Sequence, residues 1–589
     1  MKTILVSLNS KFIHSNLAIR YLSKYVEDIV SIPIYEFTIN QQPEFIASEI
    51  YNLNPDVVGF STYIWNLKET LRVCEILKLV RPELKILLGG PEVSYDGDEM
   101  MKSIPYIDYI IYGEGEEPFK EFITSLSGKR INLKDIEGLI YRQGDRIIKN
   151  PERDLIRDLN TIPSPYEDLV GEFENRIVYY ESSRGCPYNC QYCLSSTFKG
   201  VRYFDIERVK RDLTTLIEGR AKQIKFVDRT FNANKRHAME IMKFIKDKDP
   251  EDINFHFEVT AHLMDDEFLN FLKDTKEGLF QLEIGVQSTN PDTIDTISRT
   301  TDFTKLSQVV KTIKSFKNIH QHLDLIAGLP YEGYDTFKQS FNDVYNLGAE
   351  KIQLGFLKLL KGSGLRLAEE EYGYKYIDEP PYEVLESKNI SYEELLKLKA
   401  IEDLVEKYYN EGYFEHTLNY LIRTHYPSPF DFYEELSSYW KEKGYHRVLH
   451  KRSSLYKILM DFIEMKGFEN ELSIFDILKF DFILNNKNLR LKLPNQVDNS
   501  KWDIINLHDV LRKEEILSRL TEVHRRLPTK KLINKVRIER FDLDVIDLIE
   551  NDYRGKGRPG ETYILFEYME GVITRANAFD ISEIVREMI

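Results

Sequence analysis

Short apolar runs alternate with helix-like segments through the first 127 residues. The strand-like runs lie at 4–8, 32–39, 57–63, 85–90 and 108–116, and the helical patterns lie at Leu17–Val26, Glu44–Asn52, Leu67–Val80 and Pro118–Leu126. Strands that alternate with helices of this length predict an α/β fold, a Rossmann-like doubly wound parallel sheet over 1–127. Such sheets bind ligands beyond the carboxyl ends of their strands, so the residues at those ends are the functional candidates.

The same alternation returns after a linker. Six strand-like runs lie at 177–181, 223–228, 254–260, 280–286, 320–326 and 351–357, separated by helix-length segments. They predict a partial (β/α)6 barrel over 176–366, with function at the carboxyl ends of the strands. In the linker, 128–175, alternation around Gly144-Asp145 predicts a β-hairpin, and the prolines that follow predict an extended connector.

Helical patterns dominate the rest of the chain. They lie at Tyr392–Tyr409, Phe414–Ile422, Phe430–Lys443, Ser454–Lys466 and Ile474–Leu484, with one strand-like run at 562–568. We therefore predict a mainly helical C-terminal domain of unknown function over 367–589. A basic stretch at 525–537 is balanced by an acidic run at 542–552, which favours a solvated face over a nucleic-acid site.

Composition narrows the functional classes. At 589 residues the chain is too long for one core. A net charge of −16 argues against a general binder of nucleic acid or membrane surfaces. There is no apolar run of about 18 residues, so no membrane span is expected. The first residues lack the basic-then-apolar pattern of a signal peptide.

The chemistry centres on Cys186, Cys190 and Cys193 in the stretch CPYNCQYC. Thiolates are the standard protein ligands of iron–sulfur clusters, and three of them leave the fourth iron of a cube open for a substrate. Structural zinc normally takes four protein ligands, and the remaining Cys74 lies far upstream on an apolar helix face. A 4Fe–4S cluster is therefore favoured over zinc or metal-free thiols. Because such a cluster needs a reducing compartment, we expect a cytoplasmic protein.

The spacing CxxxCxxC, with the aromatic Tyr192 before the last cysteine, resembles the signature of the radical S-adenosylmethionine (SAM) superfamily. In that superfamily the amino and carboxylate groups of SAM chelate the open iron. One electron then cleaves SAM to methionine and a 5′-deoxyadenosyl radical. The resemblance implies SAM, an unidentified substrate and a low-potential electron donor such as a flavodoxin or ferredoxin as partners.

The ends of the barrel strands carry further superfamily-like segments. Asp228 resembles the acidic residue that receives the SAM amine; pairing with Arg229 or capping of the next helix is its structural alternative. Glu283 and Gln287, in a segment similar to E-x-G-x-Q-S, are four apart and share a sheet face by strand parity. The implied SAM-binding residues are Tyr192, Asp228, Glu258, Glu283, Gln287, Ser288, Ile326, Gly328 and Leu357.

The order STY, GGPE, GEGE ahead of the cysteines resembles the cobalamin-binding domain that is fused to many radical SAM enzymes. The implied cobalamin-binding residues are Ser10, His14, Ser61, Thr62, Tyr63, Gly89, Gly90, Pro91, Glu92, Gly113, Glu114, Gly115 and Glu116. The chain departs from the DxHxxG motif that supplies a lower histidine ligand, because it has neither the Asp nor the Gly at that spacing. His14 therefore has three open interpretations: it approaches the cobalt, it lies at a helix start, or it supports another residue that contacts the ligand. A Rossmann-like domain without a corrin is the alternative for the whole segment.

These features predict a cobalamin-dependent radical SAM enzyme, a C-methyltransferase in the leading hypothesis; no single catalytic residue is assigned. Two alternatives stay open. One is a non-methylating radical rearrangement, cyclisation or oxidation with a degenerate or absent corrin site. The other is a redox-sensing regulator that binds RNA or a partner, which only the basic stretch supports. Methylthiolation is disfavoured because that family's second cluster needs three more upstream cysteines, and only Cys74 exists.

Overall fold

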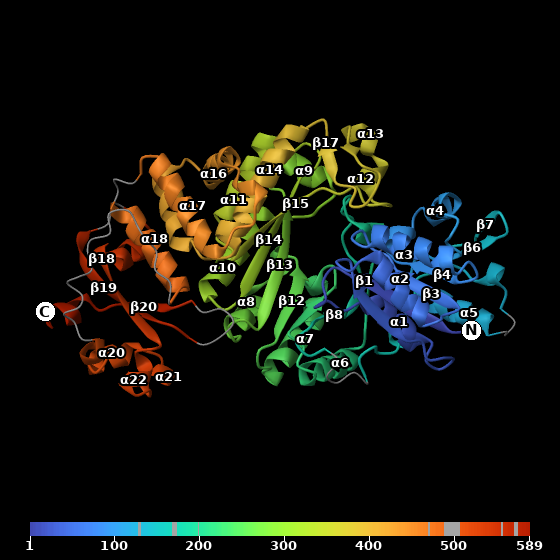
Figure 1. Cartoon of the computed structure of the whole chain (residues 1–589), viewed down its shortest axis with the longest axis horizontal. Helices are drawn as coiled ribbons and strands as arrows, with labels where there is room; N and C mark the ends of the chain where they lie inside the picture. The colour runs from blue at the N-terminus through green and yellow to red at the C-terminus, as the bar shows by residue number, and fades with distance from the viewer. Residues whose placement is uncertain are drawn as a thin grey trace. The chain divides into compact units, whose positions relative to one another are not determined.

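The computed structural model describes residues 1–127, 131–167, 173–197, 200–468, 472–487, 507–554, 558–569 and 575–588 (Figure 1). The chain divides into two compact units, Met1–Leu395 and Leu396–Ile589. Parts of the predicted linker, 128–130 and 168–172, lie outside the described residues. Among the residues that are described, we find no helix with both the length and the apolarity needed to cross a bilayer.

The first sheet has the strand order β2-β1-β3-β4-β5-β6-β7. Its strands are β1 (Thr3–Asn9), β2 (Ile34–Thr38), β3 (Val57–Ser61), β4 (Lys85–Gly89), β5 (Tyr109–Ile111), β6 (Leu139–Gln143) and β7 (Arg146–Lys149). The first five are parallel, as the alternating pattern predicts. The predicted hairpin forms as β6 and β7, and β6 pairs antiparallel with β5, so the linker extends this sheet.

Helices cover both faces of the first sheet. They are α1 (Leu17–Tyr25), α2 (Pro43–Asn52), α3 (Leu67–Val80), α4 (Gly97–Ser103) and α5 (Glu116–Leu126). One core contains Ile46 of α2 and Leu77 of α3 against strand residues such as Val58. The other contains Ile19 of α1 and Phe119 of α5. Two separate cores on one sheet confirm the doubly wound arrangement.

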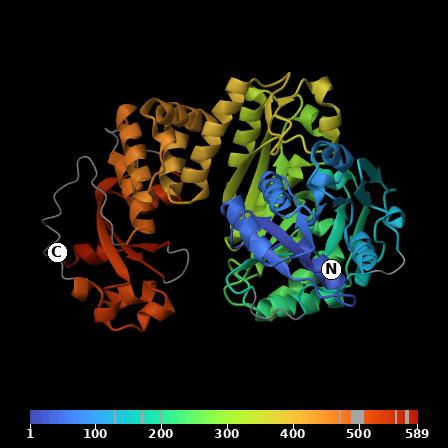
Figure 2. The same ribbon diagram turned by 45° about the vertical axis from the view of Figure 1, so that its right-hand side comes forward.

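The second sheet has the order β15-β14-β13-β12-β11-β8, and all of its strands are parallel. The strands are β8 (Ile177–Tyr180), β11 (Gln223–Phe226), β12 (Asn254–Val259), β13 (Phe280–Gln287), β14 (His320–Ala327) and β15 (Lys351–Phe356). The helices between them are α6 (Ile206–Glu218), α7 (Lys235–Lys248), α8 (Asp266–Lys273), α9 (Pro291–Thr296), α10 (Phe303–Phe316) and α11 (Tyr334–Tyr345). These strands lie side by side in both views (Figure 1, Figure 2). Because β8 and β15 are its edges, the barrel is partial, as predicted.

The second unit is helical with a small sheet. Its helices include α15 (Glu415–His425), α16 (Pro429–Lys443), α17 (Arg452–Met465) and α18 (Leu472–Asn485); α14 (Tyr392–Leu404) leads into it and continues as a π-helix, Val405–Asn410. The sheet joins β18 (Val536–Leu543), β19 (Pro559–Glu567) and β20 (Asn577–Asp580). The sequence predicts only the middle strand. The strand β18 carries many charged side chains, such as Arg537 and Glu539, which pair with each other at 2.8 Å. Because of these charges, its sequence does not show the apolar pattern of a strand.

Candidate active site

The cysteine loop follows β8 directly. A short antiparallel pair, β9 (Ser183–Cys186) and β10 (Gly200–Tyr203), places Cys186 at its end, with Cys190 and Cys193 on the loop beyond. The turn depends on Gly185, which has a φ of +99° and whose Cβ, if present, would lie 2.1 Å from the carbonyl oxygen of Gly200. Only glycine accepts both that backbone conformation and that close approach.

Each cysteine sulfur has a polar neighbour. The Cys186 Sγ lies 3.5 Å from the Thr230 hydroxyl, the Cys190 Sγ accepts a contact from Arg299 Nη1 at 3.9 Å, and the Cys193 Sγ accepts from the Ser195 amide at 3.4 Å. Burial raises the pKa of the Cys190 thiol, and the Arg299 charge opposes that rise. Donors and a cation directed at sulfur favour thiolates, which is the state that binds iron.

This donor set fits a cluster better than a single ion. Among the described residues, no group of three or more His, Cys, Asp or Glu side chains is arranged to hold one metal ion. Three thiolates that each take a different iron of a cube stand farther apart than ligands of one ion, so the two observations are compatible. All three loop cysteines are free, and the fourth, Cys74, is buried in α3.

Arg299 contacts the cysteine loop and is not among the residues predicted from the sequence. Its Nη1 donates to the Tyr192 hydroxyl at 2.9 Å, and its Nη2 donates to the carbonyl of Gly285 in β13. One guanidinium therefore joins Tyr192, Cys190 and the fourth barrel strand. No motif signals it, because Arg299 is distant in sequence from both the loop and the strand end.

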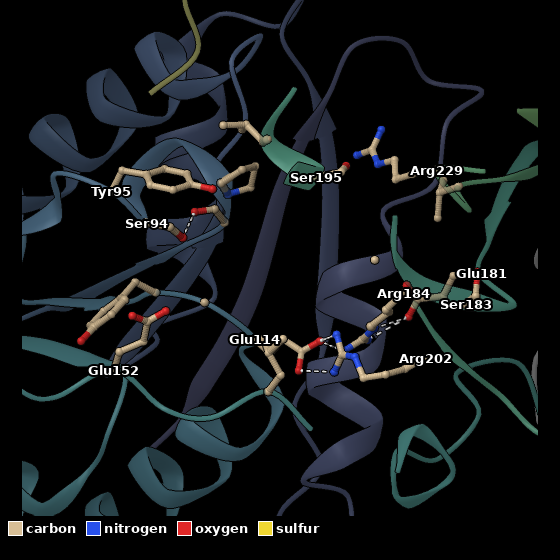
Figure 3. Close-up of a pocket in the computed structure, with 18 of the residues that line it drawn as sticks. Ser94, Tyr95, Glu114, Glu152, Glu181, Ser183, Arg184, Ser195, Arg202 and Arg229 are labelled. Atoms are coloured by element: carbon tan, nitrogen blue, oxygen red, sulfur yellow. Dashed lines mark hydrogen bonds and ion pairs between the residues drawn. The ribbon is translucent and has the colours of Figure 1, made fainter. Parts of the chain in front are cut away.

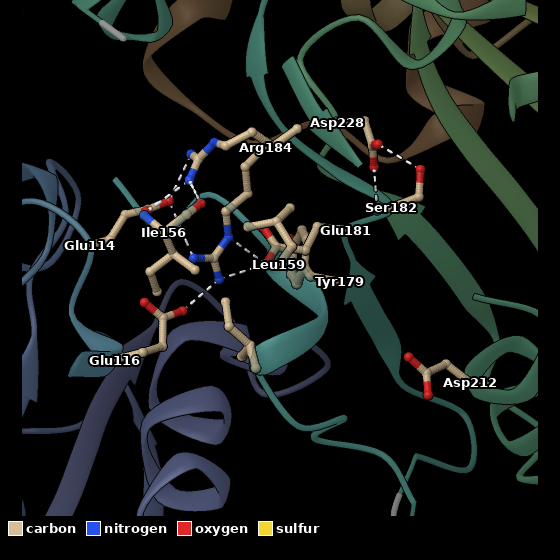
Figure 4. A network of polar contacts seen from close by, with 12 residues as sticks. Glu114, Glu116, Ile156, Leu159, Tyr179, Glu181, Ser182, Arg184, Asp212 and Asp228 are labelled. Atoms are coloured by element: carbon tan, nitrogen blue, oxygen red, sulfur yellow. Dashed lines mark hydrogen bonds and ion pairs between the residues drawn. The ribbon is translucent and has the colours of Figure 1, made fainter. Parts of the chain in front are cut away.

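Asp228 anchors the loop to the barrel. Its carboxylate accepts hydrogen bonds from the Ser182 amide at 2.9 Å and the Ser182 hydroxyl at 2.7 Å (Figure 4). It also accepts one from the Ser183 hydroxyl at 2.5 Å. The side chain is 1% exposed, and its burial raises the pKa to about 6 despite these donors. These contacts tie the end of β11 to the strand that leads into Cys186. The predicted contact of Asp228 with the SAM amine stays a prediction.

The predicted carboxylates inside the barrel differ from each other. Glu283 pairs with Lys225 at 3.2 Å and with His256 Nε2 at 2.8 Å. Burial alone would raise the pKa of Glu283, but the His256 hydrogen bond and the Lys225 charge outweigh it and lower the pKa. Glu258 has no such pairing with any residue that the structure describes; burial raises its pKa, and the charge of Arg229 opposes the rise. Glu258 is thus the more available of the two for a bound cation.

The strand parity assumed for Glu283 and Gln287 is interrupted. A β-bulge shifts the register between Gly285 and Gln287, and Gln287 has a φ of +72°. Its buried Oε1 lacks a hydrogen-bond partner among the described residues. Such an orphaned acceptor is what a ligand donor would satisfy. The neighbouring Ser288, also predicted to bind SAM, instead donates to Glu332 at 2.5 Å.

The fifth strand adds a carboxylate, Asp324, that is not among the residues predicted to bind SAM. Asp324 on β14 has a buried Oδ1 with no hydrogen-bond partner in the described part of the chain. Burial raises its pKa, and the charges of Glu283 and Glu258 raise it further. Beyond it, two more of the residues predicted to bind SAM lie close together: Ile326 is half-buried on β14, and Leu357 is buried and donates its amide to the Ala327 carbonyl at 2.9 Å. The carbonyl of Gly328 accepts from Tyr374 at 3.2 Å.

A cavity of about 970 Å³ opens between the first sheet and the cysteine loop (Figure 3). Gly90, Pro91, Gly113 and Glu114 line it from the carboxyl ends of β4 and β5. From the barrel side it is lined by Glu181, Ser183, Arg184, Gly185, Leu194, Ser195, Val227 and Arg229. Gly113 has a φ of +79° and no atom within 4 Å of where its Cβ would be, so its backbone faces open space. The volume is within the range of cofactor sites, and this lining fits a large ligand that packs on backbone.

Several predicted cobalamin contacts lie beside the cavity without lining it. Thr62 donates to the carbonyl of Gly89 at 2.9 Å, and Ser61 accepts from Asn16 at 3.2 Å. The ring of Tyr63 stacks on Trp65 with centroids 4.5 Å apart. The buried Glu92 accepts a hydrogen bond from the Tyr382 hydroxyl. These side chains make contacts within the protein that stabilise the strand ends. Their effect on a ligand is therefore to hold the backbone that lines the cavity.

The acids of the GEGE motif hold the arginines of the cysteine loop. Glu114 accepts from Arg202 at 2.8 and 2.9 Å, and Glu116 accepts from Arg184 at 2.5 Å (Figure 4). Arg184 also contacts Glu114 at 3.4 Å and Glu181 at 2.9 Å. Gly115, between the two acids, precedes the first residue of α5. The motif therefore fixes the loop against the first domain, a role that the resemblance does not imply.

His14 lies away from the cavity. Its Nδ1 is 2.9 Å from the Tyr179 hydroxyl, its carbonyl accepts from Arg176 at 2.8 Å, and burial lowers the pKa of its ring. The cap of α1 is Asn16, which accepts from the Ile19 amide, so His14 is not the helix cap. Ser10 begins the same short connection, directly after β1. The structure thus gives His14 a contact with β8, and its predicted relation to a corrin stays a prediction.

Comparisons with known proteins agree with this architecture. Residues 3–123 match the family model of the B12 binding domain, and residues 180–344 match that of the radical SAM superfamily. Residues 370–566 match a family described as a protein of unknown function, DUF4080. The two N-terminal matches coincide with the first sheet and with the barrel.

Curated relatives include proteins named as methyltransferases. The chain is 31% identical over 295 residues to the uncharacterized methyltransferase PH0819 of Pyrococcus horikoshii, covering 49% of this chain and 63% of the relative. It is 26% identical over 454 residues to the 2-(S-pantetheinyl)-carbapenam-3-carboxylate methyltransferase of Streptantibioticus cattleyicolor, covering 69% of this chain and 65% of the relative. The chain therefore spans a little under two thirds of the length of these relatives.

Two solved structures share the fold. One is the cobalamin-dependent S-adenosylmethionine radical enzyme OxsB with aqua-cobalamin and S-adenosylmethionine bound, at a TM-score of 0.56 and 16% identity over 90% of this chain and 83% of that one. The other is the methyltransferase TsrM of Kitasatospora setae with cobalamin and an iron–sulfur cluster bound, at a TM-score of 0.53 and 17% identity over 64% of this chain and 78% of that one. At these identities the likeness concerns the fold, and it confirms the predicted domain order.

Proposed function

We infer that this chain, which belongs to the radical SAM proteins that carry a B12-binding domain, is a cobalamin-dependent radical SAM enzyme and a C-methyltransferase. The observation that carries the proposal is the cavity that the B12-domain strand ends share with the cysteine loop. A ligand on the first sheet would there face the site of cluster chemistry. The methyltransferase names of the relatives support methyl transfer over the other radical reactions.

The residues divide this work among them. Cys186, Cys190 and Cys193 would hold the cluster, which when bound supplies the electron for SAM cleavage, while a corrin supplies a methyl carrier. Arg299 orients Tyr192 and places its positive charge beside Cys190. Asp228 holds the strand that leads into the loop.

The partners of this reaction follow from its chemistry. SAM and a substrate with an unactivated carbon bind at the barrel mouth. A low-potential flavodoxin- or ferredoxin-type protein supplies electrons in the cytoplasm. Nucleic acid has no place in this proposal, because the net charge is −16 and the basic stretch at 525–537 is balanced by the acidic run at 542–552.

A direct test is to purify the protein without oxygen, reconstitute it with iron, sulfide and hydroxocobalamin, and record its absorption spectrum after desalting. We expect both cluster absorption and about one equivalent of retained corrin. Incubation with SAM and a reductant should then release 5′-deoxyadenosine and methionine. A cluster spectrum without corrin bands would contradict methyl transfer and favour the non-methylating alternative.

A further inference from the structure

The cavity contains a cation that the protein leaves unpaired. Four cationic side chains line it, Lys149, Arg184, Arg202 and Arg229. Lys149 pairs with Asp98 at 2.9 Å, and Arg184 and Arg202 pair with the GEGE acids. Arg229 has no ion pair or hydrogen bond from its guanidinium to any residue that the structure describes, and its side chain is exposed. Figure 3 shows it on the same side of the cavity as Ser195.

The backbone at Arg229 is nevertheless firmly held. The preceding Asp228 is buried and accepts three hydrogen bonds from Ser182 and Ser183. The following Thr230 donates to the Arg229 carbonyl at 2.8 Å and lies 3.5 Å from the Cys186 sulfur. The guanidinium is therefore presented from a firmly held strand end, one residue before the Thr230 that contacts the Cys186 sulfur. A site that orients a reacting molecule needs such support.

The surroundings of Arg229 leave it ready for an anion. The charge of Arg229 opposes the rise that burial causes in the pKa of Glu258, but no hydrogen bond or ion pair joins these two side chains in the described part of the chain. A guanidinium presents a planar fork that matches the two oxygens of a carboxylate or phosphate. A bound ligand would displace water from the cavity. Desolvation of an unpaired cation costs free energy unless the ligand itself supplies a negative charge.

We propose that Arg229 is an anion-recognition residue of the cavity, which binds a carboxylate or phosphate of a bound ligand and so positions it beside the cysteine loop. This rests on the proposed function for the identity of the ligands. The anion has three sources of the same chemistry: the SAM carboxylate, the phosphate of the cobalamin nucleotide loop, or an acidic group on the substrate. In the last case the enzyme methylates an anionic substrate.

The test compares the reconstituted full-length wild type with Arg229→Gln, Arg229→Lys and the exposed control Arg211→Gln on α6. Each protein is assayed for SAM affinity, for corrin retained after desalting, and for calorimetric binding of inorganic pyrophosphate with SAM and corrin present. We expect Arg229→Gln to weaken one of these by about tenfold or more, the cost of losing a charge-assisted contact. Arg229→Lys should lose less, and Arg211→Gln should match the wild type.

The outcomes separate the sources. Loss of SAM affinity assigns the SAM carboxylate, and loss of corrin assigns the nucleotide-loop phosphate. Loss of pyrophosphate binding alone assigns an acidic substrate. Arg229→Gln behaving as the wild type in all three assays would overturn the inference. A wild type that retains no corrin and cleaves no SAM would instead contradict the proposed function, and pyrophosphate binding would then judge Arg229 by itself.

Discussion

The carboxyl ends of the two parallel sheets handle charge in opposite ways. At the first sheet, the acids Glu92, Glu114 and Glu116 all bind protein partners. At the barrel, Glu258 and Arg229 have no direct partner in the described residues, and Asp324 Oδ1 is orphaned. The three acids of the first sheet are therefore used within the protein, whereas the barrel leaves charged side chains without a direct partner among the described residues.

This difference separates two kinds of recognition. A large neutral surface is bound by shape, so the side chains around it are free to brace the fold. A small charged ligand is bound by side chains of opposite charge, and these side chains must not already be paired within the protein. The motif residues of the two sheets thus have different roles, although both sets lie at strand ends. Those of the first sheet stabilise the fold, and those of the barrel are available to a ligand.

The largest loss of activity should come from a change to the cysteine loop of the barrel. Cys186→Ala removes one of three cluster ligands, so iron content should fall sharply and reductive SAM cleavage should be abolished. Corrin retention should stay near the wild-type level because it depends on the first sheet. Iron analysis and 5′-deoxyadenosine release measure this, with Cys74→Ala as the control that keeps both. Cleavage of SAM by the Cys186 variant would refute the cluster assignment.

The first sheet should respond to shape. Gly113→Val places a side chain in the cavity at a φ of +79°, and we expect corrin retention to fall about tenfold or more while iron content is unchanged. Gly144→Val is the matched control, since Gly144 also has positive φ (+58°) and open space but lies at the hairpin turn outside the cavity. Equal loss in both variants would mean that backbone strain, not occupancy of the cavity, is responsible.

A buried barrel carboxylate should make stability depend on pH. Burial raises the pKa of Glu332 from its usual 4.5 to about 7, although Ser288 and Ser340 donate to it. Because the folded state favours the protonated acid, this group's contribution to stability is greatest below pH 4.5 and is lost as the pH rises through 7. The loss amounts to at most about 3 kcal/mol.

Glu332→Gln tests this dependence. The amide cannot ionise, so the decline in unfolding free energy between pH 4.5 and 7 should flatten, as measured by chemical denaturation at several pH values. Its new amide protons leave a buried donor to satisfy, which lowers stability at acid pH by about 1–3 kcal/mol. An unchanged pH profile would show that Glu332 is not the group responsible.

The smallest effect concerns the GEGE acids. Glu116→Gln weakens the contact with Arg184, but Glu114 and Glu181 still hold that arginine, so we expect a loss of about 1–3 kcal/mol in unfolding free energy. Corrin retention should change little. Glu99→Gln, on an exposed pair with Lys102, is the control and should shift stability by less than about 0.5 kcal/mol. Lost corrin with unchanged stability would show that Glu116 binds ligand instead.

The sequence by itself determined the two α/β domains, their order and the cysteine ligands, because alternating apolar periods and a compact motif are local signals. The tertiary structure decided how the motif residues are used. Arg299 and Asp324 join the site from distant segments, and a bulge that sequence parity cannot show turns Gln287. It also decided that Glu114 and Glu116 hold Arg202 and Arg184. The partner of a side chain depends on which strand ends lie close together in the folded protein. The sequence of a single segment does not show this, because the two partners come from separate segments.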